Sequence, residues 1–325
     1  MAQQDLPAGG QGGVVRGRGA LLADRLRRAL GSDVVFSFKQ SKVTMVAALI
    51  TLIMVAGAIL APWIAPHNPF DLSTISLLDA RVPPVWAEDG DPRFLLGTDD
   101  QGRDMLSTIM YGARLSLLVG FASVLFAATL GITLGLVSGY LGGALDSVIM
   151  RIADVQLTFP AILIALLIDG VAHALLGVSS KEDSAFYVLV FSIGLSFWVQ
   201  YARTVRGSTM VEKNKEYVQA ARIIGVPPVL IMIKHVLPNV TGPVLVIATI
   251  NLAVAIILEA TLSFLGVGIP ITQPSLGTLI RVGQDFLFSG EWWITIFPGI
   301  ALAALALAVN LLGDWLRDVL NPKLR

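Results

Sequence analysis

The stretch Glu216–Asn239, EYVQAARIIGVPPVLIMIKHVLPN, decides how the chain is interpreted, because it is helical in pattern and partly polar yet lies between two long apolar runs. Apolar or small residues recur in its first half at the i, i+3, i+4 and i+7 spacing: Tyr217, Ala220, Ala221 and Ile224. This spacing predicts a helix over residues 216–224 with one apolar stripe. Since a short polar turn would be enough to connect two spans, we expect a structured hairpin with a task of its own.

A sharp turn is predicted in the middle of this stretch. Gly225 stands where a residue with positive φ commonly ends a helix. Pro227 and Pro228 suit the first turn of a new helix, because the N–H groups that they lack have no partner there. The second helix is expected over Val229–Val236 and to stop before Pro238. The small alanines of the first helix favour recognition by a partner groove; the alternative is a hairpin that lies on the membrane or on its own bundle.

The composition predicts a membrane protein and excludes several classes of function. Hydrophobic residues make up 55% of the 325 residues, charged residues 14%, and the mean hydropathy is +0.75, whereas soluble domains carry about 25% charged residues. The net charge is zero, so nucleic acid is not an expected partner. There is no cysteine, and the three histidines are far apart in sequence, which argues against a metal site. No phosphate-binding loop, HExxH pair or GxSxG elbow occurs, so we expect no catalytic residues and no bound cofactor.

Charge-free runs locate the spans, since crossing the hydrocarbon core takes about 20 apolar residues. Five runs are clear: Val43–Ile64, Leu115–Leu145, Ala185–Ala202, Val240–Leu258 and Trp292–Gly313. A sixth run, 155–168, becomes long enough only if its helix begins near Ser147. With six spans, the cytoplasmic segments carry 17 Lys and Arg residues and the outer segments 6, whereas five spans give 10 and 13. Because basic residues stay on the cytoplasmic side, we expect an all-α polytopic membrane protein with six transmembrane helices and both termini in the cytoplasm.

This topology divides the chain into three regions. Residues 1–42 form a cytoplasmic N-terminal tail, and residues 43–112 form the first transmembrane helix and a large periplasmic loop. Residues 113–325 form a five-helix core, in which the hairpin 206–238 faces the cytoplasm. The periplasmic loop is acidic on balance, and it is interpreted either as a solvated loop that leads into the second span or as a docking surface for an external partner.

A glycine series runs along the second span. Gly131, Gly135 and Gly139 recur every four residues, and Gly143 continues the series. Small residues at this spacing form a smooth stripe that lets another helix backbone come close. The stripe is expected to pack either against a helix of the same chain or against a second subunit.

Two acidic residues lie near the expected outer ends of spans, Asp169 and Glu259. Ionisable side chains inside or beside the membrane are candidates for function by default. Two interpretations stay open for both residues: they lie at the membrane interface, or they line a solute translocation path.

The hairpin also resembles the EAA loop of the inner-membrane permease subunits of ABC importers. That pattern is Glu-Ala-Ala, three residues, Gly, nine residues, Ile, one residue and Leu-Pro. The matching positions are Ala220, Ala221, Gly225, Leu237 and Pro238. Gln219 stands in place of the Glu of the motif, with Glu216 one turn earlier, and His235 stands in place of its Ile.

Further stretches are similar to the C-type subunit of dipeptide, oligopeptide and nickel importers. They are LGTDDQGRD and YGARLSL within Leu96–Leu117, EATLSFLGVG over Glu259–Gly268, WWITIFPG over Trp292–Gly299 and NLLGDWLRDVLNPKLR over Asn310–Arg325. The resemblance covers most of the chain from Val43 onward. It implies the type I ABC importer permease fold and a multi-pass transport subunit of the bacterial inner membrane.

The resemblance also implies partners and roles for residues. The hairpin would be a coupling helix seated in an ATPase subunit, with these coupling residues: Glu216, Tyr217, Gln219, Ala220, Ala221, Arg222, Gly225, Leu237 and Pro238. The implied partners are a sister permease that completes a heterodimer, two cytoplasmic ABC ATPases that bind ATP and Mg, and an extracytoplasmic substrate-binding protein, all in membrane lipid. The expected solute is a di- or oligopeptide. A nickel chelate or another small solute is the alternative within this class, and a stand-alone channel or secondary carrier is the other class considered.

Overall fold

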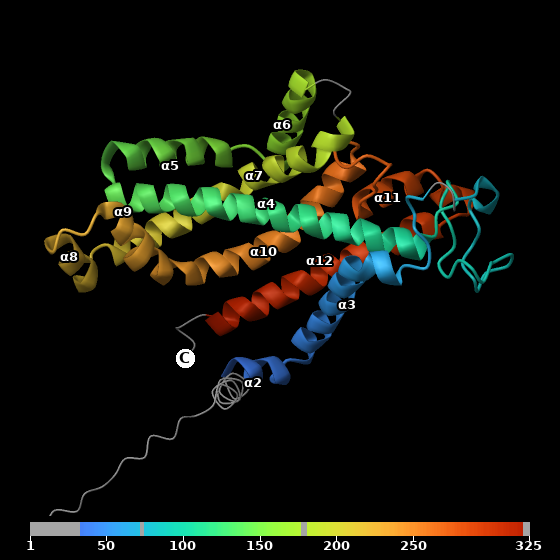
Figure 1. The fold of residues 1–325 in the computed structure, drawn as a ribbon, viewed down its shortest axis with the longest axis horizontal. Helices are drawn as coiled ribbons and strands as arrows, with labels where there is room; N and C mark the ends of the chain where they lie inside the picture. Colours follow the sequence, from blue (N-terminus) through green and yellow to red (C-terminus); the bar gives the residue numbers. More distant parts are fainter. Residues whose placement is uncertain (1–32, 72–74, 177–180, 321–325) are drawn as a thin grey trace, which may run out of the picture.

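The computed structural model describes residues 33–71, 75–176 and 181–320, and within these ranges the chain is almost entirely helical (Figure 1). The helices that build the molecule are α2 (Asp33–Gln40), α3 (Lys42–Ile64), α4 (Met105–Leu141), α5 (Gly143–Leu157), α6 (Ala161–Leu176), α7 (Lys181–Glu212), α8 (Glu216–Ile223), α9 (Pro228–Ile231), α10 (Leu237–Phe264), α11 (Leu276–Gln284) and α12 (Trp293–Leu320). The N-terminal tail lies mostly outside the described residues. The long helices lie roughly side by side and form an elongated bundle.

Among the described residues, five helical stretches are long and apolar enough to cross a membrane. They are Lys42–Ile64, Met105–Leu141, Ser184–Glu212, Pro228–Phe264 and Trp293–Val319. Each contains one of the five clear runs of the sequence or nearly all of it. The helices begin earlier or end later than those runs, because a helix continues past the apolar core of the bilayer as long as its backbone stays hydrogen-bonded.

The sixth span is bent, which corrects the expectation of a single helix from Ser147 to Ile168. α5 and α6 together pass the same test of length and hydropathy, but they meet at an angle of 97°. Pro160 explains the break, because proline lacks the N–H that a helix interior needs and disfavours helical geometry at Phe159 before it. With the bent pair counted as one span, the described residues contain six candidate spans.

Among the described residues, two large apolar cores hold the bundle together, and a third, smaller one joins α5 and α7. The first joins α4, α7 and α10, and buried residues of the hairpin contribute to it. The second joins α3, α4, α10, α11 and α12 near the opposite end of the bundle. α4 and α7 form the most extensive helix pair among the described residues, so α7, which leads into the hairpin, is firmly packed against α4.

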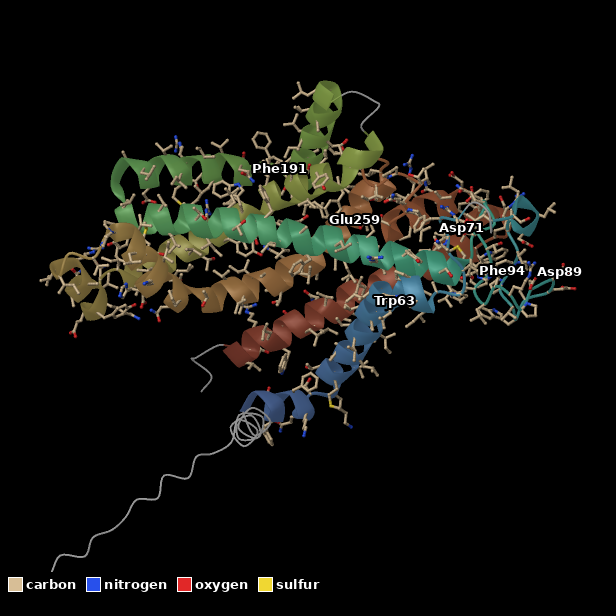
Figure 2. The ribbon with its side chains drawn as sticks, viewed as in Figure 1. Trp63, Asp71, Asp89, Phe94, Phe191 and Glu259 are labelled. Atoms are coloured by element: carbon tan, nitrogen blue, oxygen red, sulfur yellow. The ribbon has the colours of Figure 1, made fainter. Side chains whose placement is uncertain are left out.

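The described residues of the irregular segment 65–104, which are 65–71 and 75–104, lie at the end of the bundle away from α8 and α9 (Figure 1). A buried ion pair joins Arg103 and Asp99 at 2.6 Å, and Trp293 Nε1 of α12 donates a 3.0 Å hydrogen bond to the Thr98 carbonyl. Figure 2 shows Phe94 and Asp89 in this segment, and the Phe94 side chain is buried. The segment is therefore folded onto the bundle rather than extended away from it.

Candidate functional site

The hairpin lies at one end of the bundle, where α8 extends beyond the ends of the long helices (Figure 1). α8 runs from Glu216 to Ile223 and is followed by Gly225, whose φ is +81°. The Gly225 N–H donates to the Arg222 carbonyl and the Val226 N–H to the Ala221 carbonyl, each at 3.0 Å, which closes the end of the helix. The turn is found where the sequence predicts it.

The buried side of α8 differs from the predicted stripe. Val218 and Ala221 are buried against the bundle, whereas Tyr217 and Ala220 are exposed. Ile224, which belongs to the predicted stripe, is 78% exposed, and Ile223 is 86% exposed. Apolar residues cover most of the circumference of this helix, so spacing alone does not tell which of them face the protein. The hairpin therefore presents apolar side chains to its surroundings.

The second half of the hairpin does not stop before Pro238, which corrects the sequence expectation. α9 is a single turn, a π-helical turn follows over Met232–Val236, and α10 begins at Leu237 without a break. The Leu237 N–H bonds to the Met232 carbonyl five residues back, and Pro238 falls in the first turn of α10, where its missing N–H is tolerated. The hairpin is thus continuous with the next span.

Tyr217 ties α8 to both neighbouring spans. Its hydroxyl donates to the Glu212 carboxylate at the end of α7 and accepts a 3.0 Å hydrogen bond from Asn239 Nδ2 of α10. Lys215 pairs with the same carboxylate at 2.7 Å. Desolvation, and then the bond to Glu212, raise the pKa of Tyr217 to about 12, so the phenol keeps its proton as a donor. This network holds the hairpin in one orientation.

Arg222 faces the bundle rather than the outer side of the hairpin. Its Nε donates a 3.2 Å hydrogen bond to the Tyr140 hydroxyl of α4, and its guanidinium lies 4.7 Å from the centroid of the Tyr140 ring. This cation–π contact anchors α8 to the end of α4. A role of Arg222 in binding an ATPase stays a prediction.

The remaining coupling candidates surround the same elbow. Glu216 and Gln219 are exposed on α8, and Gln219 Nε2 reaches the Lys213 carbonyl at 3.4 Å. Leu237 is half-buried and Pro238 exposed at the start of α10. The structure therefore brings the predicted coupling residues together at one end of the bundle, on α8, in the turn after it and at the start of α10.

The glycine stripe packs within the chain. A Cβ on Gly131 would lie 2.5 Å from the Trp198 carbonyl oxygen, and one on Gly135 would lie 2.5 Å from that of Ala202, both on α7. Gly139 meets Arg206 and Thr209 in the same way. Gly143 does not continue this stripe, because it follows the end of α4 and has open space around it. The structure therefore shows the glycine stripe packed against a helix of the same chain, which was one of the two expected partners.

Glu259 and Asp169 occupy different places. Glu259 is fully buried within the bundle (Figure 2), where the Ser263 hydroxyl donates to its Oε1 at 2.8 Å. Its carboxyl is therefore enclosed by protein in this conformation. Asp169 on α6 lines a cavity of about 410 Å³ together with residues 266–271. The translocation role of both residues stays a prediction.

Polar contacts between α5 and α7 were not foreseen from the sequence. Arg206 binds Asp146 through two hydrogen bonds of 2.5 and 2.6 Å, and Trp198 Nε1 donates to Gln156 Oε1 at 2.6 Å. The sequence shows an acidic residue on α5 and a basic residue on α7, but it does not show that the two side chains are close in space. Among the described residues, no group of three or more His, Cys, Asp and Glu residues is placed to hold a metal ion.

The comparisons with known proteins agree with this architecture. Residues 131–325 match the family described as "Binding-protein-dependent transport system inner membrane component", and residues 30–84 match the "N-terminal TM domain of oligopeptide transport permease C". In solved structures of the MetNI methionine ABC transporter in inward-facing conformations, one chain is similar with a TM-score of 0.52. That match covers 67% of this chain and 98% of the other at 18% identity, so it supports the fold alone.

Several relatives are similar over nearly their whole length. The chain is 39% identical to the dipeptide transport system permease protein DppC of Haemophilus influenzae, over 89% of this chain and 94% of the relative. It is 38% identical to the di/tripeptide transport system permease protein DppC of Pseudomonas aeruginosa, over 89% and 91%. It is 40% identical to the dipeptide transport system permease protein DppC of Escherichia coli K12, again over 89% and 91%. The chain therefore belongs to the family of binding-protein-dependent transport system inner membrane components, as a multi-pass permease with the ABC importer fold.

Proposed function

We propose that the chain is one permease subunit of an ATP-driven importer of di- and oligopeptides in a bacterial inner membrane, and that it forms half of the translocation pore. Peptide is favoured over a nickel chelate or another small solute, because the relatives described above are named for dipeptide and di/tripeptide transport. The hairpin and both termini lie on the cytoplasmic side in this proposal, as the placement of basic residues favours.

The part of the hairpin outside the spans, residues 216–227, is the observation that carries the proposal. It extends beyond the spans and exposes Ile223 and Ile224, and grouped apolar side chains exposed to water typically mark an interaction surface. It is also attached at both ends, through the Tyr217–Glu212 contact to α7 and through the unbroken helical path into α10. A partner that pushes on this elbow moves two spans together. A cytoplasmic ATPase is the partner we propose for it.

The remaining subunits follow from this arrangement. The chain has no phosphate-binding loop of its own, so two separate ATPase subunits would bind ATP and Mg, and this chain would bind no cofactor. A sister permease would complete the pore. A substrate-binding protein would deliver peptide at the opposite end, where the segment 65–104 and α11 lie.

Co-purification with the ATPase tests the proposal. Ile224→Glu adds a carboxylate to the exposed apolar surface without touching the core, so we expect the recovery of ATPase to fall at least about tenfold, equal to about 1.4 kcal/mol of binding energy. Phe288→Glu is the matched control, because Phe288 is 96% exposed and lies close to α12 and α11, away from the hairpin. Equal recovery with both variants would contradict the assigned surface.

A second measurement addresses the channel and carrier alternative. Peptide flux into liposomes that contain only this chain would refute the proposal that the chain is a subunit of an ATP-driven importer. Flux that requires the ATPase, the sister permease and ATP would support it.

A further inference from the structure

Two cavities adjoin one arginine at the end of the bundle opposite the hairpin. The first, of about 410 Å³, is lined by Asp100 and Gln101 of the segment 65–104 and by residues of α11 and the turn after it, Asp285 among them. The second, also of about 410 Å³, is lined by Asp169 and the loop 266–271. Arg281 of α11 borders both. Each cavity lies within the range of about 300–1,000 Å³ that small-molecule sites occupy.

Arg281 lies against the backbone at Gly266. Its guanidinium carbon lies 2.9 Å from the position that a Cβ would take on Gly266, so the absence of a side chain there makes room for the planar group. Gly266 has a φ of +84° and follows the end of α10. The side chain is exposed, and within the described residues it forms no ion pair. An oriented guanidinium with free donors matches the two oxygens of a carboxylate.

Carboxylates line the first cavity beside this cation. Asp100 Oδ1 is buried and has no hydrogen-bond partner in the described structure. Burial, followed by the nearby Asp99 carboxylate, raises the pKa of Asp100, although Arg103 and Arg81 act in the opposite direction. As an acidic group in the wall of this cavity, Asp100 attracts a cationic donor that enters it, and such a donor in turn favours the charged carboxylate. Positive and negative groups around one cavity suit a zwitterion.

We propose that Arg281 binds the terminal carboxylate of a peptide solute in these cavities, while the Asp100 side of the first cavity receives its ammonium group. An extended dipeptide is about 7 Å long, at about 3.5 Å per residue, so it fits a cavity of this size. The proposal rests on the proposed function, since it names a contact of the transported peptide. A carboxylate on the surface of a docked protein is the other possible partner of Arg281. The concave surroundings favour the small ligand.

Transport by the complete transporter in proteoliposomes tests the site, with dialanine and its C-terminal amide as probes. The affinity of the binding protein for each peptide is measured separately. The transport efficiencies can then be corrected for the selectivity of the binding protein itself. We expect Arg281→Gln to lower the transport efficiency of dialanine about tenfold and to leave that of the amide nearly unchanged. Arg281→Lys should fall between wild type and Arg281→Gln, because it keeps the charge but loses the planar fork.

The control variant is Arg93→Gln, which removes an exposed cation of the segment 65–104 that lines neither cavity. It should transport both peptides like wild type. Equal loss of both peptides in Arg281→Gln would assign Arg281 to protein docking or folding and overturn the site, as would undiminished transport of dialanine. If wild type transports neither peptide in the presence of ATP, the proposed function itself fails, and the site fails with it.

Discussion

The close contact between α4 and α7 predicts that one methyl group at Gly135 destabilises the protein. A Cβ there would lie 2.5 Å from the Ala202 carbonyl oxygen and 2.9 Å from Val205 Cβ. Ordinary contacts begin at 3.4 Å. Gly135→Ala therefore requires the two helices to separate locally by roughly 0.9 Å, since the obstacle is backbone and not the end of a flexible side chain.

The cost follows from the contacts that this separation weakens. A gap of about 0.5–1 Å loses a quarter to a half of each atom pair's attraction of about 0.1–0.2 kcal/mol. For about 40 pairs, the number that one buried leucine makes, the loss is about 2 kcal/mol. This value agrees with the range of about 1–3 kcal/mol for overpacked cores. The free energy of unfolding should fall by that amount.

Unfolding in mixed detergent micelles, followed by tryptophan fluorescence, measures the change, and Trp198 lies at this interface as one reporter. Gly207→Ala is the matched control, because Gly207 lies within α7 and a Cβ there meets no atom within 4 Å. We expect the control to unfold like wild type or slightly later, since alanine favours helix. If Gly135→Ala and Gly207→Ala unfold within about 0.5 kcal/mol of each other, the reasoning from close packing is wrong.

Three further predictions concern the two ends of the bundle. Gly225→Val should leave insertion intact but impair uptake, because its φ of +81° disfavours a β-branched residue; normal uptake by the inserted variant would contradict this. Arg222→Glu should release α8 from Tyr140, so that protease cleavage within the hairpin accelerates and ATPase recovery falls while insertion is unchanged; undiminished recovery would remove Arg222 from the coupling unit. Trp293→Phe should lose about 1 kcal/mol with its bond to the Thr98 carbonyl and speed proteolysis of the segment 65–104; an unchanged cleavage rate would show that this bond does not hold the segment.

The sequence alone determined the features that depend on local composition and order. Five spans follow from uninterrupted apolar runs, because the bilayer tolerates few charges over a fixed thickness. The turn at Gly225 follows from the backbone freedom of glycine two residues before a pair of prolines. The family follows from the spacing of the hairpin and the stretches around it.

The tertiary structure decided which surfaces meet. The spacing of the glycines offered two partners, and the packing of α4 on α7 placed them within the chain. The sequence of α8 does not decide which of its apolar residues are buried. The structure shows that Val218 and Ala221 pack on the bundle. The sequence around Arg281 does not predict a binding role for this residue. Its position next to Gly266 and between the two cavities is seen only in the structure. The physical reason is that hydropathy and backbone preference act between near neighbours in the chain, whereas a contact between distant segments depends on the joint packing of several helices.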